Sequence, residues 1–350
     1  MKTKQVLAVM ITSLFLLYGC SNNQDSIAES GSIEESASAK ASGSKGSSVI
    51  HQTYKQAQQE VLVTFGAIGA SIMANSGTGP ENMDELISFH DYEGYTFTEF
   101  NYDLFTGVGH SYTAEENEDN ERALFGGNEV TKFATVGDPK VAVYYGNVAN
   151  VTFISDFIVG GNQVDLLITL LFVKTKGKWK LVHEHHSPLK VDPSTGTETG
   201  SYPIKPADLS SPAQQEVLAT FGAIGASITA NSGTGPENMD ELISFHAYGK
   251  KFTEFNYDPD GNGYSFNSEE NETNERAFFG NNKVTQFAAK ANTVNIVVYH
   301  GNVANVTFIS DFVVEGVGPI NNLITLLFVK TKGKWKLVHE HHSPENLPII

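Results

Sequence analysis

The sequence predicts an α+β protein built from two copies of one domain. Residues 167–188 and 323–344 are the same 22 residues, and residues 74–90 recur unchanged at 230–246. The offset between matching positions stays between 154 and 156 residues, whereas solenoid repeats run at about 20–50 residues. Within each copy, helix-like patterns come first and a run of strand-like patterns follows. That order indicates helices packed on one face of an antiparallel sheet.

Each copy opens with two predicted helices. Apolar residues spaced i, i+4, i+7 and i+11 form one stripe of a long first helix, at Val61, Phe65, Ile68 and Ile72. A second, short helix begins at Pro80, because proline suits the first helical position. The acidic residues after this proline suit the positive end of the helix dipole.

A strand, a polar helix and five further strands complete each copy. In the first copy the strand spans residues 95–103 and the polar helix spans residues 114–125, with the glycines at 126–127 expected to end it. Residues 176–178, Lys-Gly-Lys, predict a tight turn between the last two strands. The five later strands are predicted at residues 130–136, 141–145, 148–159, 166–174 and 179–186.

The N-terminus has the pattern of an export signal. Lys2 and Lys4 precede a mostly apolar run at residues 6–17, which is too short to span about 30 Å of hydrocarbon as a helix. The next residues, Leu-Tyr-Gly-Cys, resemble a bacterial lipobox, and Cys20 is the single cysteine of the chain. We expect removal of residues 1–19 and acylation of Cys20. The protein would then be extracytoplasmic, anchored by lipid on the periplasmic or cell-surface side of a bacterial membrane. The alternative is an ordinary secretory signal with an incidental cysteine.

Charge and composition restrict the partners and divide the chain. The formal charge is −17 at pH 7, and loss of the two lysines in residues 1–19 makes the mature chain more acidic still. Such a surface repels phosphate backbones, so we expect no nucleic-acid partner and membrane contact through the lipid alone. Residues 20–55 are Ser-rich and are predicted to form a disordered tether. The domains are expected at residues 56–188 and 212–346, joined by a linker at 189–211 with Pro and Gly.

The ending of each copy resembles a known family. Both copies finish with LLFVKTKGKWKLVHEHHSP, in which a tryptophan precedes His-x-His-x-Ser. This ending and the order of elements resemble the SnoaL-like branch of the nuclear-transport-factor-2-like superfamily. The last strand is also similar to that of the calcium/calmodulin-dependent kinase association domain. The matching residues are Trp179, His183, His185 and Ser187 in the first copy, and Trp335, His339, His341 and Ser343 in the second.

The resemblance implies two cone-shaped α+β barrel domains. In each, a curved sheet wraps around a helix and leaves a pocket at the open end. Members of the superfamily often pair through their sheets, so the two copies are expected to pair within one chain. The fold hosts isomerases, cyclases, dehydratases, transport adaptors and oligomerisation hubs, so it does not by itself define a function.

The paired histidines of the last strand are the first candidate site. Strict alternation places Trp179, Leu181, His183, His185 and Ser187 on one face, which is expected to form a pocket wall. Imidazoles at i and i+2 can hydrogen-bond a carboxylate or an enolate, or move protons near neutral pH. They can also bind a metal ion with a third ligand, or simply be held by neighbouring strands. The second copy supplies Trp335, His339 and His341, and the third ligand would be His90 or Asp156, with copies His246 and Asp311.

Arginines and inward acids are further candidates. The two arginines of the chain, Arg122 and Arg276, occupy matched sites in the polar helix. A guanidinium could hold an anionic ligand group in a bidentate manner, or form a structural salt bridge with a nearby Glu. The acids best placed to point inward, where a raised pKa would suit proton abstraction, are Glu99, Asp156 and their copies Glu254 and Asp311. The alternative for each acid is a solvated, outward-facing position.

One motif is present in the second copy alone. Residues 258–269 match the calcium-loop pattern D-x-[DN]-x-[DN]-G-x5-E, in which Asp258, Asp260, Asn262 and Glu269 would supply oxygen ligands. A proline at the second position and a strand before the loop are unusual for this motif. The sequence therefore offers a Ca²⁺ site in the second domain, and no other cofactor is required.

Two functions from different classes remain. In the first, a tethered protein uses its pockets or sheet faces to bind a small ligand or a protein partner. In the second, the protein is an isomerase, cyclase or dehydratase. His183 and His185 would then polarise a carbonyl, while Asp156 moves a proton. A deep cavity lined by His and Asp would favour catalysis, and a filled or shallow one would favour binding.

Overall fold

The computed structural model describes residues 49–102, 108–191, 209–258 and 260–345. The expected signal sequence, Cys20, most of the tether and the middle of the linker lie outside the described residues. Within the described ranges, no helix combines the length and the apolar character that a membrane span needs.

The two repeats contain the same elements in the same order. The first repeat has α1 (Lys55–Asn75), η1 (Pro80–Asn82), α2 (Asp84–Ile87), β1 (Thr98–Tyr102), β2 (Gly109–Tyr112), α3 (Ala114–Gly127), β3 (Val130–Thr135), β4 (Lys140–Tyr144), β5 (Val148–Val159), β6 (Asn162–Val164), β7 (Leu166–Thr175) and β8 (Lys178–Pro188). The second has α4 (Pro212–Asn231), η2 (Pro236–Asn238), α5 (Asp240–Ser244), β9 (Thr253–Tyr257), β10 (Gly263–Phe266), α6 (Ser268–Asn281), β11 (Val284–Ala289), β12 (Asn295–Tyr299), β13 (Val303–Val314), β14 (Gly318–Ile320), β15 (Asn322–Thr331) and β16 (Lys334–Pro344).

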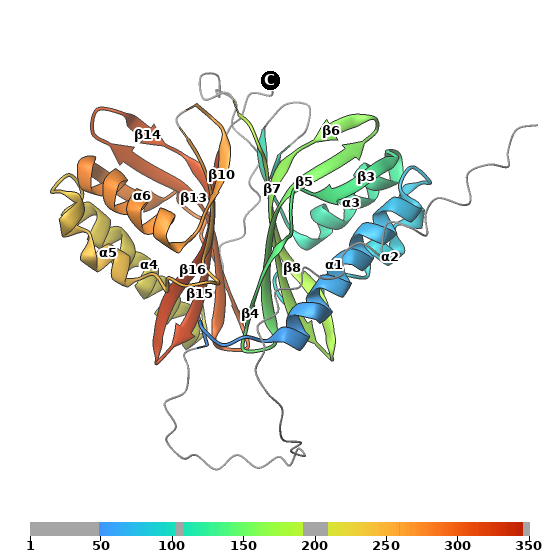
Figure 1. Ribbon diagram of the computed structural model, residues 1–350, viewed down its shortest axis with the longest axis horizontal. Helices are drawn as coiled ribbons and strands as arrows, with labels where there is room; N and C mark the ends of the chain where they lie inside the picture. The colour runs from blue at the N-terminus through green and yellow to red at the C-terminus, as the bar shows by residue number, and fades with distance from the viewer. Residues whose placement is uncertain (1–48, 103–107, 192–208, 259, 346–350) are drawn as a thin grey trace, which may run out of the picture. The chain divides into compact units, whose positions relative to one another are not determined.

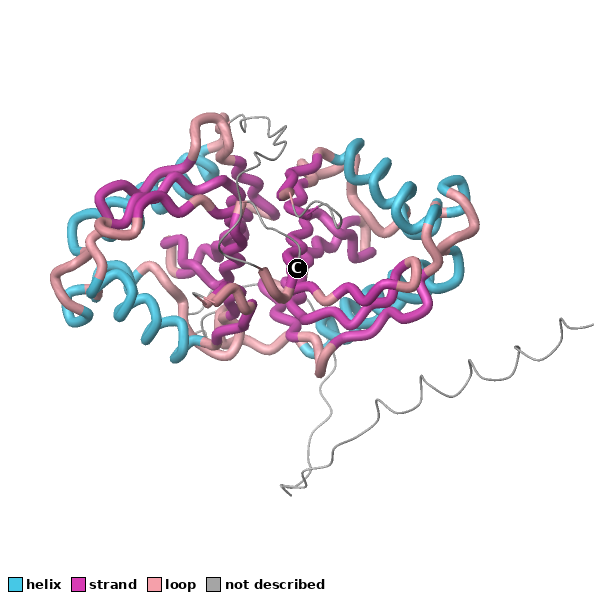
Figure 2. Tube along the Cα trace, turned by 90° about the horizontal axis from the view of Figure 1, so that it is seen from above, coloured by secondary structure: helices cyan, strands magenta, loops and turns pink. Residues whose placement is uncertain are grey.

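Each repeat forms one curved sheet with helices on one side (Figures 1 and 2). In the first repeat the neighbours follow the order β2-β1-β8-β7-β5-β3, with β4 and β6 also paired to β5. The second repeat has the same order, β10-β9-β16-β15-β13-β11, with β12 and β14 paired to β13. The ladders run antiparallel except β1–β8 and β9–β16, which are parallel. The predicted α+β class with two tandem cones is confirmed.

The helices form where the sequence pattern places them. The apolar stripe of α1 is buried against the sheet. Helix α3 begins with a capping box, in which Thr113 and Glu116 exchange hydrogen bonds between side chain and backbone. Contrary to expectation, α3 does not stop at its two glycines but includes them. Gly126 is needed for another reason, because a Cβ there would lie 2.5 Å from the backbone nitrogen of Pro80.

The last strand of each repeat carries a β-bulge that changes which residues face the cone. In β8 the pairing steps from Leu171–His183 to Phe172–Leu181, so Val182 is an extra residue. Trp179 and Leu181 pack in the core of the first cone. Beyond the bulge the inward positions pass to the even-numbered residues. The predicted strict alternation is therefore wrong past residue 181.

The outward face of each sheet contacts the sheet of the other repeat. Apolar side chains from both repeats form one cluster there, and Val49 and Ile50, from the end of the expected tether, are buried in it. The other members are Ala247, which follows α5, and residues of β4, β5, β7 and β8 and of their counterparts in the second repeat: Ala142, Tyr144, Val148, Leu171, Val173, Val182, Val297, Tyr299, Val303, Leu327, Val329 and Val338.

The paired imidazoles lie in this contact between the sheets, and not in a pocket. The Nε2 atom of His183 and the Nδ1 atom of His185 lie 3.1 and 2.9 Å from the Oγ1 atom of Thr325 in the opposite repeat. The His185 and His341 rings stack with centroids 3.7 Å apart. The side chains of His183, His185, His339 and His341 are fully buried. The expectation that they line a pocket is wrong, because the bulge turns them to the other face.

In the hydrogen bonds between the sheets, each imidazole donates through Nδ1 and accepts through Nε2, which keeps the rings neutral. The Nδ1 atom of His183 is 3.0 Å from the carbonyl oxygen of Thr98 and so donates to it, which leaves Nε2 to accept from the hydroxyl of Thr325. That hydroxyl accepts in turn from Nδ1 of His185, whose Nε2 accepts from Ser343 at 2.8 Å. Burial lowers the pKa of His183 to about 3, consistent with a neutral ring.

A second chain of hydrogen bonds repeats this arrangement from the other side. Thr169 joins His339 and His341 at 3.0 and 2.9 Å, and Ser187 lies 2.8 Å from Nε2 of His341. We call the four imidazoles with Thr169, Thr325, Ser187 and Ser343 the histidine seam. Each repeat supplies the hydroxyls that satisfy the other repeat's rings.

Replacing either seam threonine by valine should destabilise the folded chain. Thr169→Val or Thr325→Val keeps the shape but leaves two buried imidazole nitrogens without a partner, at a cost of about 1–3 kcal/mol. Urea unfolding of the full chain measures the loss. Thr131→Val, at an exposed position of β3, is the matched control and should change stability little. Equal losses at the seam and control positions would contradict this interpretation.

Candidate functional site

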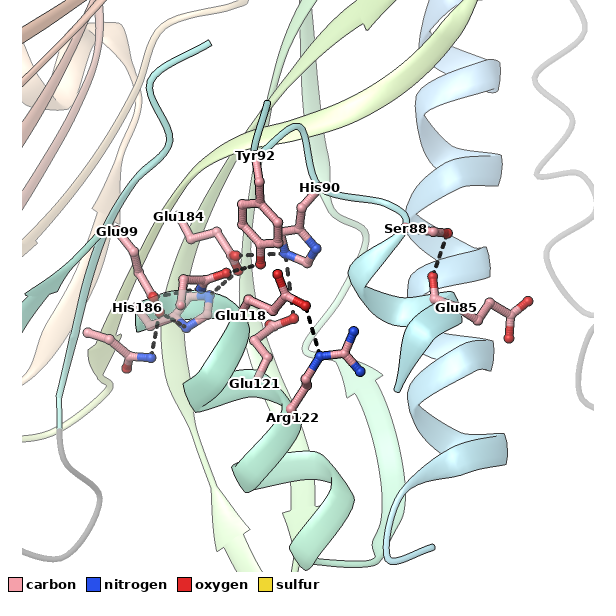
Figure 3. Close-up of polar contacts among 12 residues, drawn as sticks. Glu85, Ser88, His90, Tyr92, Glu99, Glu118, Glu121, Arg122, Glu184 and His186 are labelled. Atoms are coloured by element: carbon pink, nitrogen blue, oxygen red, sulfur yellow. Dashed lines mark hydrogen bonds and ion pairs between the residues drawn. The ribbon is translucent and has the colours of Figure 1, made fainter. Parts of the chain in front are cut away.

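The inside of each cone holds a cluster of titratable side chains that comes from four segments (Figure 3). In the first repeat, Glu184 and His186 lie on β8 beyond the bulge, and Glu121 lies on α3. His90 follows α2, where an isolated bridge pairs it with Leu181 of β8. Glu99 lies on β1, beside Glu184 in the parallel pairing with β8. We call these five residues the inner cluster.

Histidine and carboxylate alternate in the inner cluster. The Nε2 atom of His90 lies 3.1 Å from Oε1 of Glu184 and 3.5 Å from Oε2 of Glu121. The other oxygen of Glu184 lies 3.2 Å from Nε2 of His186. His90, Glu99, Glu121 and Glu184 are buried. Glu184 is therefore the shared acceptor of two imidazoles.

Glu99 is held by amides at the edge of the cluster. Its Oε2 atom accepts from Asn117 at 2.7 Å and its Oε1 atom accepts from Asn101 at 2.8 Å. The hydroxyl of Tyr92 donates to the side-chain oxygen of Asn117. The ring of Tyr92 stacks on that of His90 with centroids 5.0 Å apart. These contacts fix the side chains of Glu99 and His90.

The second repeat builds the same cluster. The Nε2 atom of His246 lies 3.3 Å from Oε1 of Glu340 and 3.5 Å from Oε2 of Glu275. Asn271 donates to Oε2 of Glu254 at 2.7 Å. His342 lies 3.3 Å from Glu340. Two nearly identical clusters in one chain show that the arrangement follows from the repeated sequence.

The pKa values within the cluster move far from their ordinary ranges. Burial alone would lower the pKa of His90, but Glu121 and Glu184 outweigh it and raise the pKa to about 9. Burial would raise the pKa of Glu184, but hydrogen bonds from His186 and His90 hold it well below its usual range. Burial and the nearby Glu184 raise the pKa of Glu121 to about 8 and that of Glu99 to about 7.

Several predicted site residues lie outside this cluster. Trp179 and Trp335 are core residues whose indole nitrogens donate to Glu60 and Glu216, each at 3.0 Å. Asp156 forms an ion pair with Lys132 at 2.5 Å. Asp311 accepts from Gln286 at 2.6 Å in an exposed contact. The expectation that Asp156 and Asp311 point inward is wrong, because strand alternation turns them away from the cone.

The two arginines make surface contacts instead of facing a pocket. Arg122 pairs with Glu118 of its own helix and with Asp84, each at 2.9 Å. Arg276 repeats both contacts with Glu272 and Asp240. Both guanidiniums also donate to the carbonyl of the proline that opens the neighbouring 3₁₀ turn. The structural alternative, a salt bridge to nearby acids, therefore describes both.

The calcium-loop pattern begins in the turn between β9 and β10 and ends in the first turn of α6. Oδ1 of Asp258 accepts from the backbone amides of Asp260 and Asn262 at 2.9 and 2.8 Å, and the Asn262 side chain donates to the same carboxylate. Glu269 lies in the first turn of α6. Asp258 therefore uses one oxygen to close the turn. The Ca²⁺ site stays a prediction.

A cavity of about 220 Å³ lies beside the inner cluster of the first repeat. Glu99 and Tyr92 belong to its wall, together with the start of α3. Two residues of the second repeat, Asn295 and Thr307, complete it. The remaining lining residues are Tyr95, Thr96, Phe97, Thr98, Phe100, Ser111, Tyr112, Thr113 and Ala114. The wall combines five aromatic side chains with six Ser, Thr or Asn side chains and one buried carboxylate.

Sequence reasoning named His90, Glu99, His246 and Glu254 but missed their partners. The missed residues are Tyr92, Asn117, Glu121, Glu184 and His186, and in the second repeat Tyr248, Asn271, Glu275, Glu340 and His342. One signal was available, because Asn and Glu four residues apart in the polar helix are present in both copies. Residues that share a helix face at i and i+4 can reach one site.

In the presence of a chelator, the free energy of unfolding of the chain should fall as the pH rises from about 6.5 to 9. The pKa of His90 and His246 is raised from 6.5 to about 9, so their contribution is complete below pH 6.5 and is lost as the pH rises through 9. Glu121 and Glu275, with pKa values raised from 4.5 to about 8, act in the same direction. Urea unfolding at pH 6 and 9 with a chelator present tests this. Stability that is flat or rises over this interval would refute it.

Comparison with known proteins finds a family model that matches both repeats. The SnoaL-like domain model matches residues 122–190 and 255–346. No match was found among curated proteins. A solved structure from Xanthomonas campestris, provisionally described as a calcium/calmodulin-dependent protein kinase II association domain, is 16% identical, covers 43% of this chain and 96% of its own, and has a TM-score of 0.32.

Two further solved structures have the same kind of similarity. An NTF2-like protein of unknown function from Pseudomonas putida KT2440 is 12% identical, covers 41% of this chain and 93% of its own, and has a TM-score of 0.33. A protein from Streptomyces avermitilis, provisionally described as a dehydratase of the NTF2-like family, is 18% identical, covers 38% of this chain and 96% of its own, and has a TM-score of 0.31. The two matches to the SnoaL-like domain model lie in corresponding parts of the two repeats, so both repeats are similar to SnoaL-like domains.

Proposed function

We propose that this protein is a lipid-anchored extracytoplasmic binding protein that holds a small ligand in the cavity beside Glu99. The cavity carries the proposal because it places a buried carboxylate beside several aromatic rings and includes residues of both repeats. Ligand sites are commonly concave, mostly apolar and equipped with a few polar groups that fix orientation. At about 220 Å³ the cavity suits a compact molecule.

The chemistry of the wall selects for a ligand with a cationic or hydrogen-bond-donating group. Both oxygens of Glu99 are accepting groups, and the rings of Tyr92, Phe97 and Tyr112 favour an apolar or cationic body. An anionic ligand would meet Glu99 and a chain with a formal charge of −17. We therefore expect small aromatic or aliphatic amines to bind in preference to carboxylic acids.

An acid–base enzyme is supported less well than a binding protein. The imidazoles that would polarise a carbonyl, His183 and His185, are buried between the sheets and hydrogen-bonded in the histidine seam. Asp156, which would move the proton, is in an ion pair with Lys132. The inner cluster is closed by its own histidine–carboxylate contacts. Binding therefore accounts for the cavity without requiring those residues.

Benzylamine should bind to the full chain and benzoate should not. The amine can reach the Glu99 carboxylate while its ring contacts the aromatic wall, so the melting temperature should rise with amine concentration. Glu99→Gln should weaken binding about tenfold, because a charge-assisted hydrogen bond is lost. Asp156→Asn neutralises an acid away from the cavity and serves as the control. Calorimetry showing equal affinity for benzoate, or unchanged binding by Glu99→Gln, would exclude the proposed ligand class.

The lipid anchor is tested separately. Cells producing the full-length chain should incorporate a radiolabelled or clickable fatty-acid precursor into it, and Cys20→Ala should abolish that labelling. Cys20 is the single cysteine of the chain, so a free thiol elsewhere cannot take over. Ser21→Ala is the control and should remain labelled. Labelling that persists in Cys20→Ala would show that the anchor is not at this residue.

A further inference from the structure

We propose that each inner cluster is a binding site for one divalent transition-metal ion, held by His90, Glu121 and Glu184 in the first repeat. The matching ligands in the second repeat are His246, Glu275 and Glu340. In both repeats one imidazole nitrogen and two carboxylate oxygens lie within 4.8 Å of one another. Among the described residues, these two sets are the groups of His, Cys, Asp and Glu that converge in this way.

The spacing of the ligand atoms already suits a shared ion. Nitrogen and oxygen ligands lie about 2.0–2.2 Å from zinc, so neighbouring ligands of one ion are roughly 3–3.5 Å apart. The Nε2 atom of His90 lies 3.1 and 3.5 Å from the two carboxylate oxygens, and that of His246 lies 3.3 and 3.5 Å from its two. The same geometry occurs in both repeats, as their similar α3 and α6 sequences lead one to expect.

The histidine is oriented as a metal ligand. In the second repeat the Nδ1 atom of His246 lies 3.2 Å from the carbonyl oxygen of Leu242, and donating there leaves Nε2 for the ion once the ion displaces its proton; in the first repeat, Nδ1 of His90 has no hydrogen-bond partner among the described residues. A ligating histidine usually donates its other ring nitrogen to a carbonyl or a carboxylate in this way. The second oxygen of Glu184 is held by His186, and that of Glu340 by His342, so both shared carboxylates have an outer partner.

One carboxylate oxygen in each site lacks a hydrogen bond. The Oε2 atoms of Glu121 and Glu275 are buried and have no hydrogen-bond partner among the described residues. Each points at the imidazole nitrogen of its site, 3.5 Å away. An unsatisfied buried carboxylate oxygen is costly, and a bound cation would satisfy it. This is a second observation, independent of the clustering, that indicates a missing ligand.

The local charge also calls for a cation. Glu99, Glu121 and Glu184 lie together in a buried space with two histidines, and protons must otherwise balance the excess negative charge. A divalent ion would displace those protons, as it does when metals bind to carboxylate and imidazole ligands. Imidazole together with carboxylate suits Zn²⁺ and similar transition metals more than Ca²⁺, which prefers oxygen ligands alone.

The experiment is a titration of the chelator-treated full chain with Zn²⁺, followed by calorimetry and elemental analysis. We expect two ions per chain and a higher melting temperature. Glu121→Gln or Glu275→Gln should each reduce the stoichiometry to one, and the double variant should bind none. Glu118→Gln with Glu272→Gln, in the same two helices but paired with the arginines, is the control and should still bind two.

A measurement on the unaltered chain covers the case in which a variant fails to fold. X-ray absorption of the Zn²⁺-loaded protein should show nitrogen and oxygen neighbours at about 2.0–2.2 Å. Absence of Zn²⁺ binding by the unaltered chain would overturn the proposal. So would a folded double variant that still binds two ions. The amine test at Glu99 is to be run on chelator-treated protein as well, so that its outcome is independent of this one.

Discussion

The single extra residue in the last strand of each repeat determines how the polar side chains of this protein are used. Without the bulge at Val182, the tryptophan, both seam histidines and Ser187 would all face the cone. With it, the apolar start of the strand fills the core, while Glu184 and His186 enter the cone and His183 and His185 leave it. The extra residue thus divides the strand into an apolar first half, which packs in the core, and a second half that is polar on both faces.

These two polar faces obey opposite electrostatic rules. On the outer face, buried imidazoles stay neutral because every ring nitrogen meets a backbone carbonyl or a hydroxyl, and burial lowers the pKa. On the inner face, carboxylates surround the imidazole of His90 and raise its pKa instead. His186, next to His185 in the sequence, also contacts Glu184 and has a raised pKa, so the pKa values of adjacent histidines shift in opposite directions because their partners differ. The HEHH segment alone does not reveal which rule applies to which ring.

Most of the fold could be read from the sequence, and most of the site could not. The apolar stripe of α1, the capping pattern of α3 and the period-two strands are local features, so their elements appear close to the predicted bounds. The short strands β2 and β6 were not predicted, because each has only three or four residues and is defined by its pairing with the strand before it, β1 or β5. The bulge is a feature of pairing between β7 and β8, which leaves no trace in the alternation of one strand.

The candidate site was missed for the same reason. His90 and Glu99 were named because they are polar residues that recur in both copies. Glu121 and Glu184 become their neighbours only through the tertiary packing of α3 and the one-residue shift of β8. Side chains that meet through tertiary contacts cannot be paired from spacing in the chain. The duplication shows which polar residues recur in both copies, but not which of them contact one another.

The histidine seam gives the tandem arrangement an unusual kind of interdependence. Thr325 satisfies two rings of the first repeat, and Thr169 satisfies two rings of the second. A substitution in either copy of the terminal strands therefore alters the chemistry of the opposite copy as well as its own. Recombination that replaced one repeat by a homologous domain without the matching threonine and serine would leave buried ring nitrogens of the seam histidines without hydrogen-bond partners. The two repeats must therefore be inherited together, because each supplies the hydrogen-bond partners of the other's buried histidines.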